Sequence, residues 1–126
     1  MSVQMTDVVL VLSTVPDDQS TETLARALID ERLAACVNVH APMVSIYRWK
    51  GSVERDSERQ LVIKTTRAAL PGLEKRLREL HPYELPEFIV VEASGGSEQY
   101  LRWVVQEVPK VQEVPKVPKV PGVPEV

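Results

Sequence analysis

Apolar residues in this 126-residue chain form several short β-favouring runs, separated by polar and proline-containing segments. The run from Val8 to Val15 is continuous, which predicts a strand covered on both faces. Between Val44 and Trp49 the pattern alternates, placing Ser45, Tyr47 and Trp49 on one face of a strand. Further strands are predicted at Cys36–Val39, Gln60–Thr66 with a weaker start near Val53, and Phe88–Val91. Lys50, Gly51 and Ser52 form a plausible hairpin turn.

Between these strands, apolar residues recur every three or four positions, which predicts amphipathic helices. The first helix begins at Ser20 or Thr21 and is expected to run to about Ala34. The second begins near Pro71, with Leu73, Leu77 and Leu80 as its apolar stripe. A short last helix is predicted from Ser97 to Glu107, with three residues facing inward: Tyr100, Leu101 and Val104.

The resulting order, βαββαβ with a trailing helix, is typical of a ferredoxin-like α+β sandwich with two helices on one face of an antiparallel sheet. Its hairpin is too long for the sandwich. Arms of about 13 residues reach roughly 40 Å at 3.3 Å per residue, whereas a domain of this size has a radius of gyration of about 13 Å. Ile46, Tyr47 and Trp49 on the projecting part need a cover, so we expect a homo-oligomer.

A change in composition marks the end of the predicted domain, which covers residues 1–107. In the remaining tail, residues 108–126, valine falls at every third position and Pro-Lys-Val units repeat. A period of three matches polyproline II. We therefore consider two states for the tail: a disordered low-complexity segment, or an ordered polyproline-II arm in a groove of its own or a neighbouring subunit.

Charge and cysteine content exclude several classes of function. A net charge of −3 and a pI near 5.4 argue against a nucleic-acid partner, which needs a basic face. Cys36 is the single cysteine, so no intramolecular disulfide can form. The N-terminus has no signal-peptide pattern and no run approaches about 18 apolar residues, so no membrane partner is expected. A cytoplasmic location is the default prediction.

The segment from His81 to Glu87 crowds an imidazole, a phenol and two carboxylates between two prolines. Because each proline holds the preceding residue extended, this proline loop (residues 81–87) is stiff. It could bind an ion, relay protons or simply connect a helix to a strand. His81 is either a satisfied helix-end histidine or a functional one. A polar pocket could also include three residues of the return strand: Asp56, Glu58 and Lys64.

Two other groups remain ambiguous in the sequence. Cys36 is either a small buried hydrophobe, or a soft metal ligand or reactive thiol, but no CxxC, CxH or HxxxH spacing accompanies it. Cys36 and His40 share a strand face about 13 Å apart, too far to bind one ion without a bulge. Tyr47 and Trp49 either pack against other residues or form a pocket wall.

Five ordered motifs stand out along the chain: Arg32-Leu33-Ala34-Ala35-Cys36-Val37-Asn38, Ser45-Ile46-Tyr47-Arg48-Trp49-Lys50-Gly51, Lys64-Thr65, His81-Pro82-Tyr83-Glu84-Leu85-Pro86-Glu87 and Tyr100-Leu101-Arg102-Trp103. Together they resemble the CutA divalent-cation tolerance family over about Val8 to Trp103. The resemblance implies a trimer similar in architecture to PII signalling proteins, with sheets that pair across subunits. It also implies a role in tolerance to divalent metals such as copper, copper binding in some members, and no established catalytic activity.

Carried onto this chain, the resemblance implies an intersubunit ligand cleft lined or braced by Tyr47, Trp49, Lys64, His81, Tyr83, Glu84 and Glu87. For a metal such as Cu²⁺ or another divalent cation, it points to Cys36 and His81. Two departures weaken that site: Ser13 stands where some members have cysteine, and Leu80 where some have a second histidine. A tight transition-metal site usually needs three or four ligands.

Three functions are therefore considered. The leading hypothesis is a non-enzymatic, trimeric cytoplasmic protein of the metal response, which binds an ion or small ligand and signals to an unidentified partner. The alternative is an acid/base enzyme in which Glu84 orients His81 and Lys64 holds an anion. An RNA-binding module shares the βαββαβ order, but the chain is acidic and has a single Phe.

Overall fold

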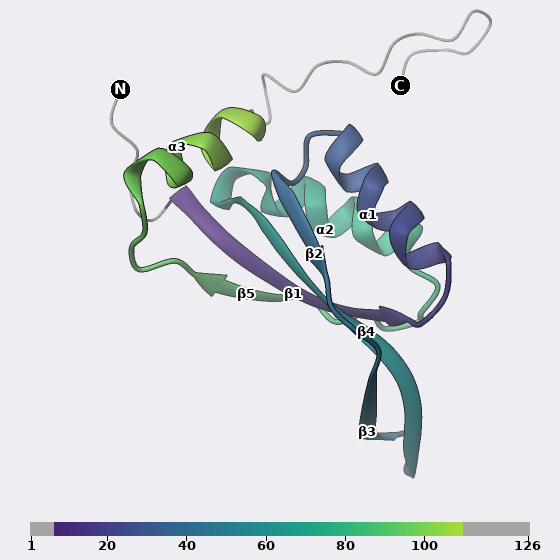
Figure 1. Cartoon of the computed structure of the whole chain (residues 1–126). Coiled ribbons are helices and arrows are strands. Elements are labelled where there is room, and N and C mark those ends of the chain that lie inside the picture. Colours follow the sequence, from purple (N-terminus) through teal and green to yellow (C-terminus); the bar gives the residue numbers. More distant parts are fainter. Residues whose placement is uncertain (1–6, 110–126) are drawn as a thin grey trace, which may run out of the picture.

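In the computed structural model, which describes residues 7–109, two layers are formed by an antiparallel sheet and the helices that cover one of its faces (Figure 1). The elements follow the order β1 (Val8–Pro16), α1 (Ser20–Asp30), β2 (Cys36–Val39), β3 (Met43–Trp49), β4 (Ser52–Thr66), a 3₁₀ turn (Arg67–Ala69), α2 (Leu70–Leu80), β5 (Ile89–Glu92) and α3 (Glu98–Glu107). This order confirms the predicted ferredoxin-like α+β class with a trailing helix.

The sheet has the strand order β2-β4-β1-β5, and β3 pairs with the outer part of β4. In the central pair, β1 and β4, Val11 lies opposite Ile63 and both are fully buried. Leu28 of α1 and Leu73 of α2 pack in the same core. Each such side chain contributes about 1.5–3 kcal/mol through burial, so this layer contact holds the two helices on the sheet.

The hairpin does project beyond the sandwich, as its length predicted. β4 is 15 residues long, but β1 pairs only with its inner part, residues 58–66. The outer part pairs with β3 alone, from Met43 opposite Glu58 to Trp49 opposite Ser52. Figure 1 shows this β3–β4 ribbon leaving the body of the molecule, away from α1 and α2. None of the helices within residues 7–109 covers either face of this ribbon.

Two sequence predictions at helices were wrong. α1 ends at Asp30 rather than near Ala34, because Arg32 adopts a left-handed conformation with φ 57°. Tyr100 of α3 does not face inward and is 43% exposed. Only Leu101 and Val104 are buried there, where they pack with Val8, because this short helix contacts the sheet along a narrow stripe.

Glycine substitutions at two sites are expected to change stability in opposite directions. Gly51 occupies the hairpin turn with φ 85°, so Gly51→Ala should lower the free energy of unfolding by about 1 kcal/mol. Gly72 lies inside α2, and an added Cβ would meet Leu33 Cδ2 at an ordinary 3.5 Å. Gly72→Ala should therefore raise the free energy of unfolding by about 0.5 kcal/mol. Urea unfolding of both variants tests this, and a change of the same sign in both would contradict it.

The predictions for the tail, residues 108–126, concern a segment that lies outside the described residues except for Val108 and Pro109. Val108, directly after α3, is 2% exposed. Among the helices of the described part, none is long and apolar enough to cross a membrane.

Candidate functional site

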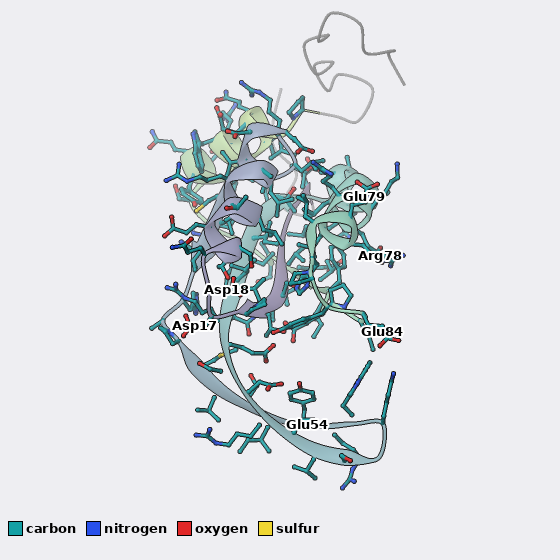
Figure 2. All side chains as sticks on the ribbon, turned by 90° about the vertical axis from the view of Figure 1, so that its right-hand side faces the viewer. Asp17, Asp18, Glu54, Arg78, Glu79 and Glu84 are labelled. Carbon is teal, nitrogen blue, oxygen red and sulfur yellow. The ribbon has the colours of Figure 1, made fainter. Side chains whose placement is uncertain are left out.

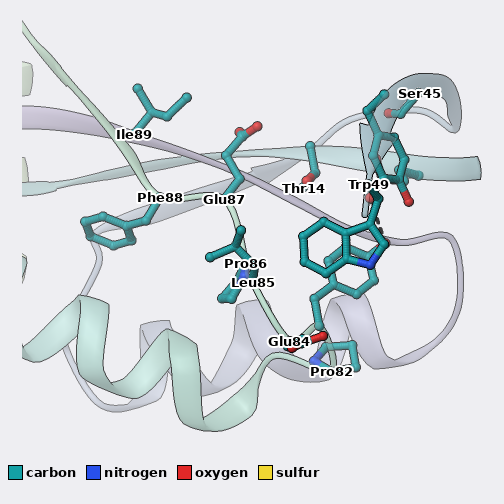
Figure 3. A pocket seen from close by; sticks show the side chains of 13 residues that line it. Thr14, Ser45, Trp49, Pro82, Glu84, Leu85, Pro86, Glu87, Phe88 and Ile89 are labelled. Carbon is teal, nitrogen blue, oxygen red and sulfur yellow. Dashed lines mark hydrogen bonds between the residues drawn. The ribbon is translucent and has the colours of Figure 1, made fainter. Parts of the chain in front are cut away.

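A cleft of about 780 Å³ lies between the outer hairpin and the proline loop (Figure 3). It brings together five of the residues predicted from the sequence: Tyr47, Trp49, Tyr83, Glu84 and Glu87. Residues absent from that prediction complete the lining: Thr14, Ser45, Glu58, Pro82, Leu85, Pro86, Phe88 and Ile89. Two segments more than 30 positions apart in the chain thus form one concave surface.

Local backbone rules explain how each wall is presented. Ser45, Tyr47 and Trp49 line the cleft from one face of β3 because strand residues alternate in direction, as the sequence indicated. The opposite wall begins where α2 ends at His81, whose ψ of 135° is the extended conformation imposed by Pro82. Pro86 holds Leu85 in the same way. Figure 3 shows Trp49 of the hairpin and Pro82 and Glu84 of the proline loop among the side chains that line the cleft.

Two tyrosine–carboxylate pairs involve the cleft tyrosines: one joins the proline loop to β4, and the other links β3 to β4 within the hairpin. The Tyr83 hydroxyl donates a hydrogen bond to Glu58 Oε2 at 2.7 Å, and the Tyr47 hydroxyl donates one to Asp56. Glu58 is only 6% exposed. The hydrogen bond to Asp56, with burial and nearby carboxylates adding to it, raises the pKa of Tyr47 to about 12. Burial raises the pKa of Tyr83 as well, and the hydrogen bond to Glu58 makes the second-largest contribution. Both phenols therefore remain neutral donors at physiological pH.

Asp56→Asn is expected to bring the pKa of Tyr47 down from about 12 toward its ordinary value of about 10, because the carboxylate acceptor and its charge are both removed. The ultraviolet absorbance of phenolate during an alkaline titration measures this. Tyr47→Phe serves as the control that assigns the titration step. An unchanged titration curve in Asp56→Asn would contradict the pairing.

His81 is held in the interior by both of its ring nitrogens. Its Nε2–H donates to the Thr14 carbonyl at 2.7 Å, and Nδ1 accepts from the Tyr83 backbone N–H at 3.1 Å. His81 as a residue is 7% exposed, and its ring contacts the Tyr83 ring with centroids 4.7 Å apart. Burial lowers the pKa of His81, and this outweighs the opposing effects of the Thr14 carbonyl and the Glu58 charge. The arrangement favours a neutral structural histidine that braces the loop behind the cleft wall.

Lys64 and Cys36 lie elsewhere. They are opposite one another on β4 and β2, and Lys64 Nζ lies 5.5 Å from the ring centroid of Tyr100 on α3. Lys64 also faces Leu10 on β1, whereas His81 contacts Thr14, four residues or about 13 Å further along that strand. Neither Lys64 nor His81 is among the residues that line the cleft. The structure therefore does not bring Cys36 and His81 together as ligands of one ion.

Glu58 is the main residue that the site prediction omitted. Its place on the return strand was noted, but nothing local distinguishes it from Glu54 or Asp56. Its burial depends on tertiary contacts, because Glu58 lies between β1 and β3 and accepts a hydrogen bond from Tyr83 of the proline loop. Figure 2 shows the hairpin curving so that its tip approaches Glu84.

The chain matches a known protein family over most of its length. The profile described as CutA1 divalent ion tolerance protein matches residues 9–107. The chain therefore belongs to the CutA1 family. A relative from Thermus thermophilus named divalent-cation tolerance protein CutA is 46% identical over 95 residues, which cover 75% of this chain and 92% of that protein. The chloroplastic CutA of Arabidopsis thaliana is 40% identical over 96 residues, or 76% of this chain and 53% of that protein.

Solved CutA structures agree with the fold. The crystal structure of CutA from Xylella fastidiosa superposes with a TM-score of 0.79 at 47% identity, covering 82% of this chain and 99% of that one. This CutA1-family chain thus spans nearly all of the bacterial proteins but only about half of the Arabidopsis relative. Membership of the family supports a role in tolerance to divalent cations. The relatives' names describe tolerance rather than a reaction.

Proposed function

We propose that this chain is a non-enzymatic, trimeric protein of the divalent-cation response, PII-like in architecture, which binds a ligand in the cleft and signals its bound state to a partner protein. The observation that carries this proposal is the cleft itself, where the projecting hairpin faces the rigid proline loop across about 780 Å³. Family membership supports the link to divalent cations, and copper is the cation that we propose. A cytoplasmic location belongs to the same proposal.

Exposed apolar surface supports the oligomer. On the face of the hairpin opposite Tyr47 and Trp49, Val44, Ile46 and Val53 are 54%, 69% and 64% exposed. The edge strand β5 exposes Ile89, Val90 and Val91 to 51%, 38% and 40%. Exposed edge strands and apolar ribbons are normally covered in stable proteins. Neighbouring copies would provide that cover, and the cleft would then lie near the boundaries between subunits.

The donor groups of the described residues do not fit a complete transition-metal site within one subunit. Within residues 7–109, no three His, Cys, Asp or Glu side chains are grouped so that they could hold one ion. Both His81 nitrogens already form hydrogen bonds, so either would have to release a backbone group before it could coordinate a metal. A bound copper ion would therefore need ligands from more than one subunit. The same geometry removes support for the acid/base alternative, because His81 is engaged and Lys64 lies outside the cleft.

Native mass spectrometry with and without Cu²⁺ or Zn²⁺, combined with calorimetric titration, tests the proposal. We expect three subunits and saturable binding of a cation tighter than millimolar, with a whole number of ions per trimer. A stable monomer at micromolar concentration would contradict the trimer. Absence of binding up to millimolar copper, zinc and small ligands would contradict the cleft.

A further inference from the structure

The walls of the cleft carry only one sign of charge. Among the lining residues of the described chain there are three carboxylates, Glu58, Glu84 and Glu87, and no Lys, Arg or His. Four aromatic rings line the same space: Tyr47, Trp49, Tyr83 and Phe88. Aromatic faces and carboxylates both attract cations, and rings also accept apolar groups. An anion would meet repulsion, and a hydrated metal ion would gain little from the rings.

The buried carboxylate of this set has no cationic partner within the described residues. Glu58, at 6% exposure, accepts a hydrogen bond from the neutral Tyr83 hydroxyl and is in none of the ion pairs of residues 7–109. Glu87 likewise accepts from the neutral amide of Gln60 at 3.2 Å. A buried carboxylate is costly unless it is paired or neutralised, so a cationic ligand would find these charges uncompensated.

An ammonium group already occupies one edge of this region. Lys50 Nζ lies 5.4 Å from the ring centroid of Trp49 and 3.5 Å from Glu84 Oε2. Trp49 and Glu84 therefore present a ring face and a carboxylate at a spacing that suits one ammonium. The side chains of Lys50 and Glu84 are 68% and 72% exposed, so this contact is weak and exchangeable.

We propose that the cleft binds an organic ammonium ion, an amine or quaternary ammonium compound, with its cationic head against Trp49 and between the carboxylates of Glu84 and Glu58. The proposal rests on the cleft being the ligand site of the proposed function, and it names the ligand class. Lys50 is then an internal competitor that the ligand displaces from Trp49. The aliphatic parts of the ligand contact Leu85 and Phe88.

The test compares a cation with its neutral shape analogue. Full-length protein carrying Trp103→Phe leaves Trp49 as its single tryptophan, so fluorescence reports the cleft wall. Choline is titrated against 3,3-dimethyl-1-butanol, in which carbon replaces the charged nitrogen. We expect saturable binding of choline in the millimolar range or tighter, and at least about 10-fold weaker binding of the neutral analogue. Equal affinities, or no saturable response to choline, would overturn the proposal.

Two variants examine the assigned contacts. Lys50→Met removes the competitor from an exposed site without affecting the core, and it should tighten choline binding at least about threefold. Glu58→Gln keeps an acceptor for Tyr83 but removes the charge, and it should weaken binding at least about fivefold. An unchanged or weaker affinity in Lys50→Met would overturn the role of the Trp49 and Glu84 pair. If Glu58→Gln does not fold, Lys50→Met still tests whether the ligand binds against Trp49 and Glu84.

The same samples distinguish this inference from the proposed function. Calorimetric titration with Cu²⁺ is performed alongside the choline titration. Copper binding without choline binding would overturn the ammonium proposal and leave the divalent-cation role standing. Choline binding without copper binding would support the ammonium proposal and contradict direct metal binding. Failure of both ligands would overturn both proposals for this cleft.

Discussion

His81→Ala is expected to lower the free energy of unfolding by about 2–4 kcal/mol, although His81 is the residue that most resembles a catalytic or metal-binding group in the sequence. The change removes the donor to the partly buried Thr14 carbonyl and the acceptor for the Tyr83 N–H. An unpaired buried polar group costs about 1–3 kcal/mol, and the lost contact with the Tyr83 ring adds to it. Urea unfolding at neutral pH measures the effect.

Two conservative variants separate the contacts of His81. In His81→Asn, the side-chain oxygen can accept from the N–H two residues on, as in an Asx-turn, but it does not reach Thr14. In His81→Gln, the longer amide can donate to Thr14 instead. We expect each to recover part of the stability that His81→Ala loses. Native stability in His81→Ala would show that the ring is dispensable for the fold.

The stability of the native chain should also fall as the pH decreases below about 6.5. Because burial lowers the pKa of His81 in the folded state, the unfolded chain takes up a proton first, at its ordinary pKa near 6.5. The free energy of unfolding therefore decreases as the pH falls from about 6.5 to the lower pKa of His81 in the folded protein. Unfolding at pH 7.5 and 5.5 should show a smaller difference in His81→Asn than in the native chain. His40→Asn, which removes an exposed imidazole, tests whether the effect belongs to the buried ring.

Ile46→Lys is expected to convert the proposed trimer to monomer at micromolar concentration. Ile46 is 69% exposed in one chain and lies opposite Arg55, on a face that also holds Arg48. If a neighbouring subunit covers this face, a lysine at position 46 would be buried beside the two arginines. This face of the hairpin carries no carboxylate to pair with it. Such burial costs several kcal/mol, equivalent to a loss of about 100-fold or more in association.

Sedimentation and native mass spectrometry measure this change. Ile46→Val is the matched control, since it keeps an apolar β-branched side chain at the same position and should remain oligomeric. The chain should keep its fold as a monomer in Ile46→Lys, because the hairpin lies outside the core formed by β1, β4, α1 and α2. An unaltered mass in Ile46→Lys would show that this face is not part of the interface.

Much of the fold followed from local patterns. The alternation at Ser45, Tyr47 and Trp49 determined which face of β3 lines the cleft, and Pro82 determined where α2 ends. The end of α1 was missed because Leu33 continues the apolar spacing, although the backbone has already reversed at Arg32. Tyr100 was misplaced for a related reason: periodicity identifies a stripe but not how wide a contact the sheet provides.

The amino-acid sequence by itself determined the order of the elements, the projecting hairpin and the rigid loop from His81 to Glu87, because these depend on spacing and on the backbone limits of proline. Only the tertiary structure decided what that loop does. It directed the His81 nitrogens to Thr14 and Tyr83, placed Lys64 beside Tyr100, and brought Glu58 under the Tyr83 hydroxyl. These outcomes depend on strand register and on contacts between segments far apart in the chain, which local spacing does not specify.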